Sequence, residues 1–158
     1  MAKNKRIRAG RQAIFFAVLA ALLLLFIFSN SAVPRELSAE RSSRIMALLR
    51  PIFDPQHRVA DDVFHHYIRK AAHFSEFAAL GFSLLGLADS FFWQRKSSRW
   101  LLPQLVSALA AAADETIQIF SVERGPAVKD VCLDIIGAAF GIVCMLFLLA
   151  SMRGSKKL

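Results

Sequence analysis

The sequence predicts an all-α fold, a polytopic membrane bundle of four transmembrane helices with a short amphipathic helix on its outer side. Of its 158 residues, 56% are hydrophobic, which is more than a soluble domain of this length ordinarily carries. The hydrophobic residues gather in helical runs at 13–28, 67–93, 100–120 and 130–150. These runs are close to the roughly 20 residues that cross a bilayer as a helix.

The first run follows a strongly basic N-terminal tail. The tail contains Lys3, Lys5, Arg6, Arg8 and Arg11 and no acidic residue. A basic start, an apolar run and small residues near position 31 are also typical of a cleaved signal peptide. We favour a retained helix, because the rest of the chain already predicts a membrane bundle. The alternative is a mature chain that begins near Val33.

The longest polar connection contains a second kind of helix. Ile45, Leu48, Leu49 and Ile52 recur at helical spacing, which predicts a short amphipathic helix that ends at Pro51 or soon after. Such a helix either lies on the membrane surface or packs over the outer end of the bundle. Downstream, an acidic residue at position 61 or 62 is expected to cap the next helix.

Charge predicts the orientation and excludes one class of partner. The net charge is +8, but the basic residues flank apolar runs, which indicates contact with membrane lipids and no binding of nucleic acid. The N-terminal tail, residues 94–99 and the C-terminal tail are basic and lack acids. Four spans place all three on one side, so we expect a multi-pass protein of the plasma (inner) membrane with both termini cytoplasmic. The single domain, 1–158, divides into a tail and first span (1–28), an outer segment (29–66), a three-helix core (67–150) and a cytoplasmic tail (151–158).

Ionisable residues inside spans are costly, so they usually face a protein interior or water and often mark function. Arg69, His73 and Glu76 lie at i, i+4 and i+7 on one side of the second span, flanked by Lys70. Arg69 and Lys70 also fit interfacial anchors, and His73 also fits a hydrogen bond across the bundle. Glu76 is more than a turn inside an apolar run, so it should be paired or protonated, with position 69, 70 or 124 as the available basic partner.

The third and fourth spans carry further polar stripes. Asp114, Glu115 and Gln118 share a broad face of the third span, and Asp130 and Asp134 are one turn apart on the fourth. Asp130 also fits a plain helix N-cap, whereas Asp134, one turn deeper, has no such explanation. Because the second span begins outside, the third ends outside and the fourth begins outside, the three stripes should converge at the outer leaflet.

Two further features of the spans are the glycines that continue the stripe of Asp130 and Asp134 deeper into the fourth span, and a separate acid near the inner end of the second span. Gly137 and Gly141 form a GxxxG pattern on the fourth span, which permits close packing against another helix. Asp89, near the inner end of the second span, is expected simply to sit at the membrane interface.

The polar blocks resemble the VanZ-like membrane protein family. The family pattern is similar to a basic-basic-x-x-His-Phe-x-Glu block, an Asp-Glu-x-x-Gln block, and then an arginine and an Asp-x-x-x-Asn block before glycines. In this chain the matching positions are 69–77, 80–81, 114–120, Arg124, 130–131 and Gly137. Two departures are visible. Val122-Glu123 replaces a frequent Pro-Gly pair, and Asp134 stands where asparagine is common, which adds an ionisable acid.

The resemblance implies a small multi-span protein of the cell envelope. The founding member of the family is associated with resistance to the glycopeptide antibiotic teicoplanin, so the resemblance suggests antibiotic resistance as the biological setting. From the residues we expect a non-enzymatic protein whose outer polar site binds an amphiphile: a membrane lipid, a lipid-linked wall precursor or a glycopeptide. The predicted binding residues are Arg69, Lys70, His73, Glu76, Asp114, Glu115, Gln118, Arg124, Asp130 and Asp134.

Three other hypotheses remain open at the level of sequence. The first is a membrane-embedded enzyme that acts on a lipid-linked substrate, with His73, Glu76, Asp114 and Glu115 as candidate catalytic residues. That site has no metal-protease motif and no obvious nucleophile. We expect no cofactor and no metal, although a histidine with several carboxylates is also a possible ligand set. The second is a proton or ion pathway. The inner half of the bundle has few ionisable residues to complete such a pathway, which argues against it. The third is a purely structural role.

Overall fold

The computed structural model describes residues 2–91, 99–121 and 128–154, and in these ranges the chain is all-α, as predicted. Five helices follow one another: α1 (Ala2–Ser31), α2 (Arg35–Phe53), α3 (Asp61–Phe91), α4 (Leu101–Ile119) and α5 (Val128–Gly154). The predicted aspartate cap of α3 is wrong by one position, because Asp61 and Asp62 both lie within its first turn and the N–H of Phe64 bonds to the backbone oxygen of Ala60. Residues 92–98 and 122–127, which include Arg124, lie outside the described ranges.

Three of the described helices are long and apolar enough to cross a membrane, at Gly10–Ser31, Asp61–Phe91 and Val128–Arg153. The fourth predicted span, α4, has only 19 residues. It carries Asp114, Glu115 and Gln118, which lower its mean hydropathy. The structure therefore supports a membrane protein with three candidate spans, and the span along α4 stays a prediction.

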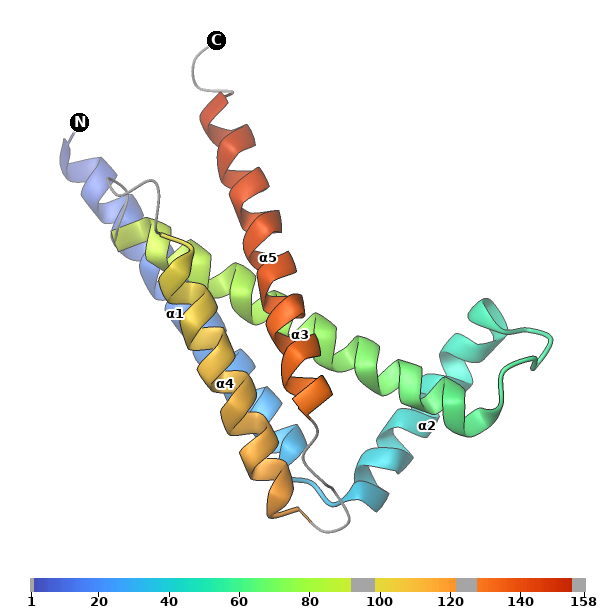
Figure 1. The fold of residues 1–158 in the computed structure, drawn as a ribbon. Coiled ribbons are helices and arrows are strands. Elements are labelled where there is room, and N and C mark those ends of the chain that lie inside the picture. Colours follow the sequence, from blue (N-terminus) through green and yellow to red (C-terminus); the bar gives the residue numbers. More distant parts are fainter. Residues whose placement is uncertain (1, 92–98, 122–127, 155–158) are drawn as a thin grey trace.

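The helices are arranged around α3 (Figure 1). α1 and α4 run side by side along one flank, and α5 crosses α3 on another. The N-terminus of α1 and the C-terminus of α5 lie at the same end of the molecule, which we call the terminal end. The opposite end, where α1 and α4 finish, α5 begins and α2 lies, is called the α2 end. The predicted polar stripes all fall toward the α2 end.

Close contact between the backbones of α3 and α5 fixes the crossing of these helices. A Cβ atom added to Gly137 would lie 2.6 Å from the carbonyl oxygen of Phe74, and one added to Gly141 would lie closer still to the carbonyl oxygen of Ala78. Only residues without side chains allow this approach, as in other GxxxG contacts between membrane helices. The contact brings the polar stripe of α5 directly against that of α3.

The hydrophobic core joins all four long helices. Its buried members include Ile27 from α1, Phe77 and Leu80 from α3, Ala111 from α4 and Ala138 from α5. The sequence assigned the core to residues 67–150. In the structure α1 also packs into this core, and its last turn contributes to the polar region described below. Cleavage of α1 is a separate matter, which N-terminal sequencing of the purified protein tests.

The predicted amphipathic helix is present as α2, which is longer than the run of apolar residues indicated. It ends at Phe53 and contains Pro51 in its last turn. The proline cannot donate the usual backbone hydrogen bond to the carbonyl four residues earlier, which favours the end of the helix soon afterwards. Its docking to α3 depends on Arg50, which is 6% exposed. The guanidinium donates to Asp61 at 2.5 Å and to Asp54 at 3.3 Å, and it lies over the ring of Phe64.

Candidate functional site

Polar side chains from α3, α4 and α5 meet in the interior of the bundle toward the α2 end. His73, Asp114 and Asp134 each offer a ligand-type atom, and these three atoms lie within 4.8 Å of one another. Nδ1 of His73 lies 3.9 Å from Oδ1 of Asp134. We call these three residues the polar triad. The three polar stripes were expected to converge from helical phase, and in the structure one residue from each of three helices lies close to the other two.

The triad is buried, and several of its polar atoms have no hydrogen-bond partner among the described residues. Asp114 and Asp134 are both 0% exposed. Within the described ranges, four atoms of the triad have no hydrogen-bond partner: both carboxylate oxygens of Asp134, Oδ1 of Asp114 and Nδ1 of His73. Buried polar groups in folded proteins are almost always satisfied, so unsatisfied atoms at one point are an unusual feature of this molecule.

Neighbouring residues hold the triad in place from α4 and α1. The amide of Gln118 donates to Oδ2 of Asp114 at 3.0 Å and lies 3.5 Å from the hydroxyl oxygen of Ser31. The hydroxyl of Ser121 donates to the backbone oxygen of Ser31 at 2.8 Å. Glu115, the next residue along α4 after Asp114, is also buried. Ser31 was missed by the sequence reasoning, because a serine at the end of a span gives no signal until its neighbour is known.

Lys70 and Asp130 form an ion pair between α3 and α5 at the edge of this region. Both side chains are partly exposed. This pairing removes Lys70 as a partner for Glu76, which the sequence had left open. The N-cap interpretation of Asp130 was also wrong, because α5 begins at Val128 and the aspartate lies within its first turn.

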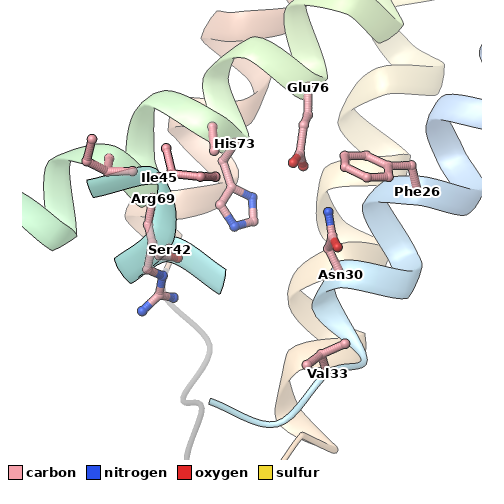
Figure 2. A pocket seen from close by; sticks show the side chains of 10 residues that line it. Phe26, Asn30, Val33, Ser42, Ile45, Arg69, His73 and Glu76 are labelled. Atoms are coloured by element: carbon pink, nitrogen blue, oxygen red, sulfur yellow. The ribbon is translucent and has the colours of Figure 1, made fainter. Parts of the chain in front are cut away.

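A pocket with a volume of about 280 Å³ opens beside the triad, between α1, α2 and α3 (Figure 2). Arg69, His73 and Glu76, the predicted stripe of α3, all line it. The other walls are mostly apolar and consist of Phe26, Asn30, Val33, Ser42, Ile45, Ile68 and Ala72. His73 belongs both to the pocket and to the polar triad, so it forms the boundary between them.

Glu76 has a partner that the sequence analysis did not foresee. The side chain of Asn30, at the end of α1, hydrogen-bonds to the Glu76 carboxylate, and Figure 2 shows the two facing each other across the pocket. The guanidinium of Arg69 points away from Glu76 in the same view. Within the described ranges Arg69 makes no ion pair with a carboxylate. The basic partner expected for Glu76 is therefore not position 69 or 70, and position 124 lies outside the described ranges.

A second buried charge cluster lies at the terminal end. Asp89 is 8% exposed and pairs with Arg99 at 2.8 Å and with Arg153 at 2.8 Å. The expectation that Asp89 simply sits at the membrane interface was therefore incomplete, because two arginines from other segments enclose it. The three residues lie far apart in the chain, so helical spacing within one segment cannot predict this cluster.

Comparison with known proteins agrees with the family suggested by the sequence blocks. The family model described as VanZ/LLP1 matches residues 16–149, which covers most of the chain. No curated protein and no solved structure matches the chain significantly. The match includes the whole of the polar triad and every described residue that lines the pocket. The chain therefore belongs to the VanZ/LLP1 family.

Proposed function

We propose that this protein binds a membrane amphiphile, with the polar headgroup held in the pocket between α1, α2 and α3. The observation that carries the proposal is the division of the pocket lining into two parts. Arg69, His73 and Glu76 supply ionisable groups from one helix, while side chains such as Phe26 and Ile45 supply apolar surface. A ligand with a charged head and a hydrocarbon chain matches both parts.

The ionisable groups suggest the chemistry of the headgroup. A guanidinium with no carboxylate partner in the described part of the chain is suited to phosphate or pyrophosphate oxygens, which it binds through two parallel hydrogen bonds. A carboxylate such as Glu76 accepts hydrogen bonds from hydroxyl or amine groups of a sugar or amino alcohol. A volume of about 280 Å³ suits a headgroup and the first atoms of its chain, near the lower limit for small-molecule sites.

The side of the membrane follows from charge and gives the proposal its biological setting. The basic tails and the basic segment 94–99 favour a cytoplasmic terminal end in the plasma membrane, so the α2 end and the pocket face outward. There the candidate ligands are phospholipids and lipid-linked precursors of the cell wall. A role in resistance to teicoplanin-type glycopeptides rests on family membership alone.

Lipids that copurify with the full-length protein in mild detergent provide the test. We expect mass spectrometry to find a phosphate-containing lipid enriched with the wild type, and at least tenfold less of it with Glu76→Ala. The loss of one charge-assisted hydrogen bond, about 1.5 kcal/mol or more, accounts for a factor of this size.

Ser75→Ala is the matched control, because Ser75 is adjacent to Glu76 but its exposed hydroxyl bonds only to the backbone oxygen of Ala71. Circular dichroism and gel filtration establish that each variant is folded. An equal lipid content in wild type, Ser75→Ala and Glu76→Ala would contradict the proposal.

The second candidate function is an enzyme that acts on a lipid-linked substrate. It is favoured by the position of His73, which lines the pocket and has the carboxylate of Asp134 at 3.9 Å on its other side. An imidazole supported by a carboxylate is a common general base. Incubation of lipid extracts with wild type and with His73→Ala separates the two functions. Binding without any wild-type-dependent product supports the first, and a product that requires His73 supports the second.

A further inference from the structure

The burial of the polar triad leaves an electrostatic problem in the fold. Asp114 and Asp134 are fully buried from different helices, and burying a carboxylate without a cation or sufficient hydrogen bonds is strongly unfavourable. Asp114 receives one hydrogen bond, from Gln118. The carboxylate oxygens of Asp134 receive none from the described residues.

The nearby basic side chains are engaged or directed elsewhere. Lys70 pairs with Asp130, and Arg69 lines the pocket, where its guanidinium points away from Glu76. His73 is the only basic side chain that the described structure places within ion-pair distance of Asp134, and its Nδ1 is itself unpartnered. The unpartnered atoms from three helices thus face one shared space.

The three atoms have the identities and nearly the spacing of metal ligands. In a tetrahedral site with bonds of about 2.1 Å, ligand atoms lie roughly 3.4 Å apart. The triad atoms are within 4.8 Å of one another, so small side-chain rotations bring them to that spacing. One imidazole nitrogen with two carboxylate oxygens suits first-row divalent ions such as Zn²⁺ and Mn²⁺, whereas Ca²⁺ and Mg²⁺ prefer oxygen-only sites.

We propose that His73, Asp114 and Asp134 form a binding site for a divalent transition-metal ion. The ion's two positive charges balance the two carboxylates, and the ion ties α3, α4 and α5 together at one point. Asp134 supplies the second negative ligand beside Asp114. The site departs from the expectation of no metal that the sequence motifs alone suggested.

The metal site also extends the proposed function, on which this step rests. His73 belongs to the pocket as well as to the triad, so an ion held there lies at the pocket wall. A divalent ion beside Arg69 adds a second positive group for a phosphate oxygen of the bound amphiphile.

Isothermal titration of Zn²⁺ into full-length protein, stripped of metal with chelator in detergent, tests the site. We expect one ion per chain and a rise in melting temperature on binding, because a ligand that binds only the folded state stabilises it. Asp134→Asn should weaken binding at least tenfold, since it removes a charged ligand. His73→Gln is the second variant and should weaken binding similarly. Asp62→Asn is the control and should keep the wild-type affinity, because this exposed carboxylate lies in the first turn of α3, about three helical turns before His73.

The inference is overturned if wild type binds no Zn²⁺ and no Mn²⁺, or if Asp134→Asn and His73→Gln both bind with wild-type affinity. This result is independent of the lipid experiment with Glu76→Ala, because Glu76 is not one of the three ligands. If the protein binds no metal but its lipid content depends on Glu76, the proposed function stands and the metal site fails. If it binds metal but its lipid content does not depend on Glu76, only the metal site stands.

Discussion

Arg153, close to the end of α5, donates hydrogen bonds to both carboxylate oxygens of Asp89 in α3, at 2.8 and 2.9 Å. Arg99, just before α4, donates to the same carboxylate at 2.8 Å. One buried acid thus connects three segments at the terminal end. It lies at the opposite end of α3 from the polar triad, so its role can be examined without touching the candidate site.

Replacing this acid should destabilise the bundle without affecting ligand binding. Asp89→Asn leaves two arginines without their anion, and we expect a loss of about 2 kcal/mol, because the guanidinium groups are partly buried. For a chain of this size that corresponds to a fall in melting temperature of roughly 4–8 °C, measured by thermal unfolding in detergent. Asp62→Asn, at an exposed position at the start of the same helix, should leave the melting temperature unchanged. Equal melting temperatures for both variants would show that the cluster contributes nothing.

The glycines of α5 offer a second test of the packing. Gly141→Ala would place a methyl group against the backbone oxygen of Ala78, and a backbone cannot move aside as a flexible side chain can. We expect a loss of about 1–3 kcal/mol, the usual cost of overpacking. Gly10→Ala is the control, because a Cβ there has nothing within 4 Å. If Gly141→Ala melts like Gly10→Ala, the close approach of α3 and α5 is wrong.

The connection between α2 and α3 should respond to acid. Burial by itself raises the pKa of Asp54, but the amide N–H groups of Arg58 and Val59 and the charge of Arg50 outweigh it, so the pKa is lowered from its ordinary value. A lowered carboxyl pKa stabilises the connection above the ordinary value of about 4. The stabilisation is lost as the pH falls through the lowered pKa.

Nuclear magnetic resonance titration of the side-chain carboxyl carbons checks the pKa of Asp54 directly. We expect Asp54 to titrate below the ordinary aspartate pKa of about 4. The amide shifts of Arg58 and Val59 should move together with Asp54, because it accepts their hydrogen bonds. A titration midpoint of Asp54 at or above that ordinary aspartate value would contradict this account.

The amphipathic helix makes a prediction about the membrane surface. Leu48, Ile52 and Phe53 on α2 are 75%, 71% and 73% exposed, which favours insertion of this face into the lipid interface. In vesicles with bromine-labelled lipids, the added fluorescence of Ile52→Trp should be strongly quenched. Ala47→Trp, about 140° around the helix, should be quenched much less. Similar quenching at both positions would favour the alternative in which α2 does not lie in the interface.

The sequence by itself determined the fold class, the family and the end of the bundle where the polar residues gather. These follow from properties that are local in the chain. Apolar runs of sufficient length specify helices in a membrane because the backbone must satisfy its own hydrogen bonds there. Residues spaced by about one turn, such as Arg69, His73 and Glu76, necessarily share a side of their helix. The same reasoning predicted a fourth span along α4, but the acids and amides of this helix keep it outside the three candidate spans of the described chain.

The tertiary structure alone decided which side chains meet. Glu76 meets Asn30 of α1, while Lys70 meets Asp130 of α5, and spacing within α3 predicts neither pair. Partners depend on the rotation and crossing of neighbouring helices, which the close α3–α5 contact sets at Gly137 and Gly141. That contact brings His73 to Asp134. The pocket likewise needs α1 and α2, although neither helix contributes an ionisable residue to its lining. A cavity forms between several surfaces, so no single segment of the sequence predicts it.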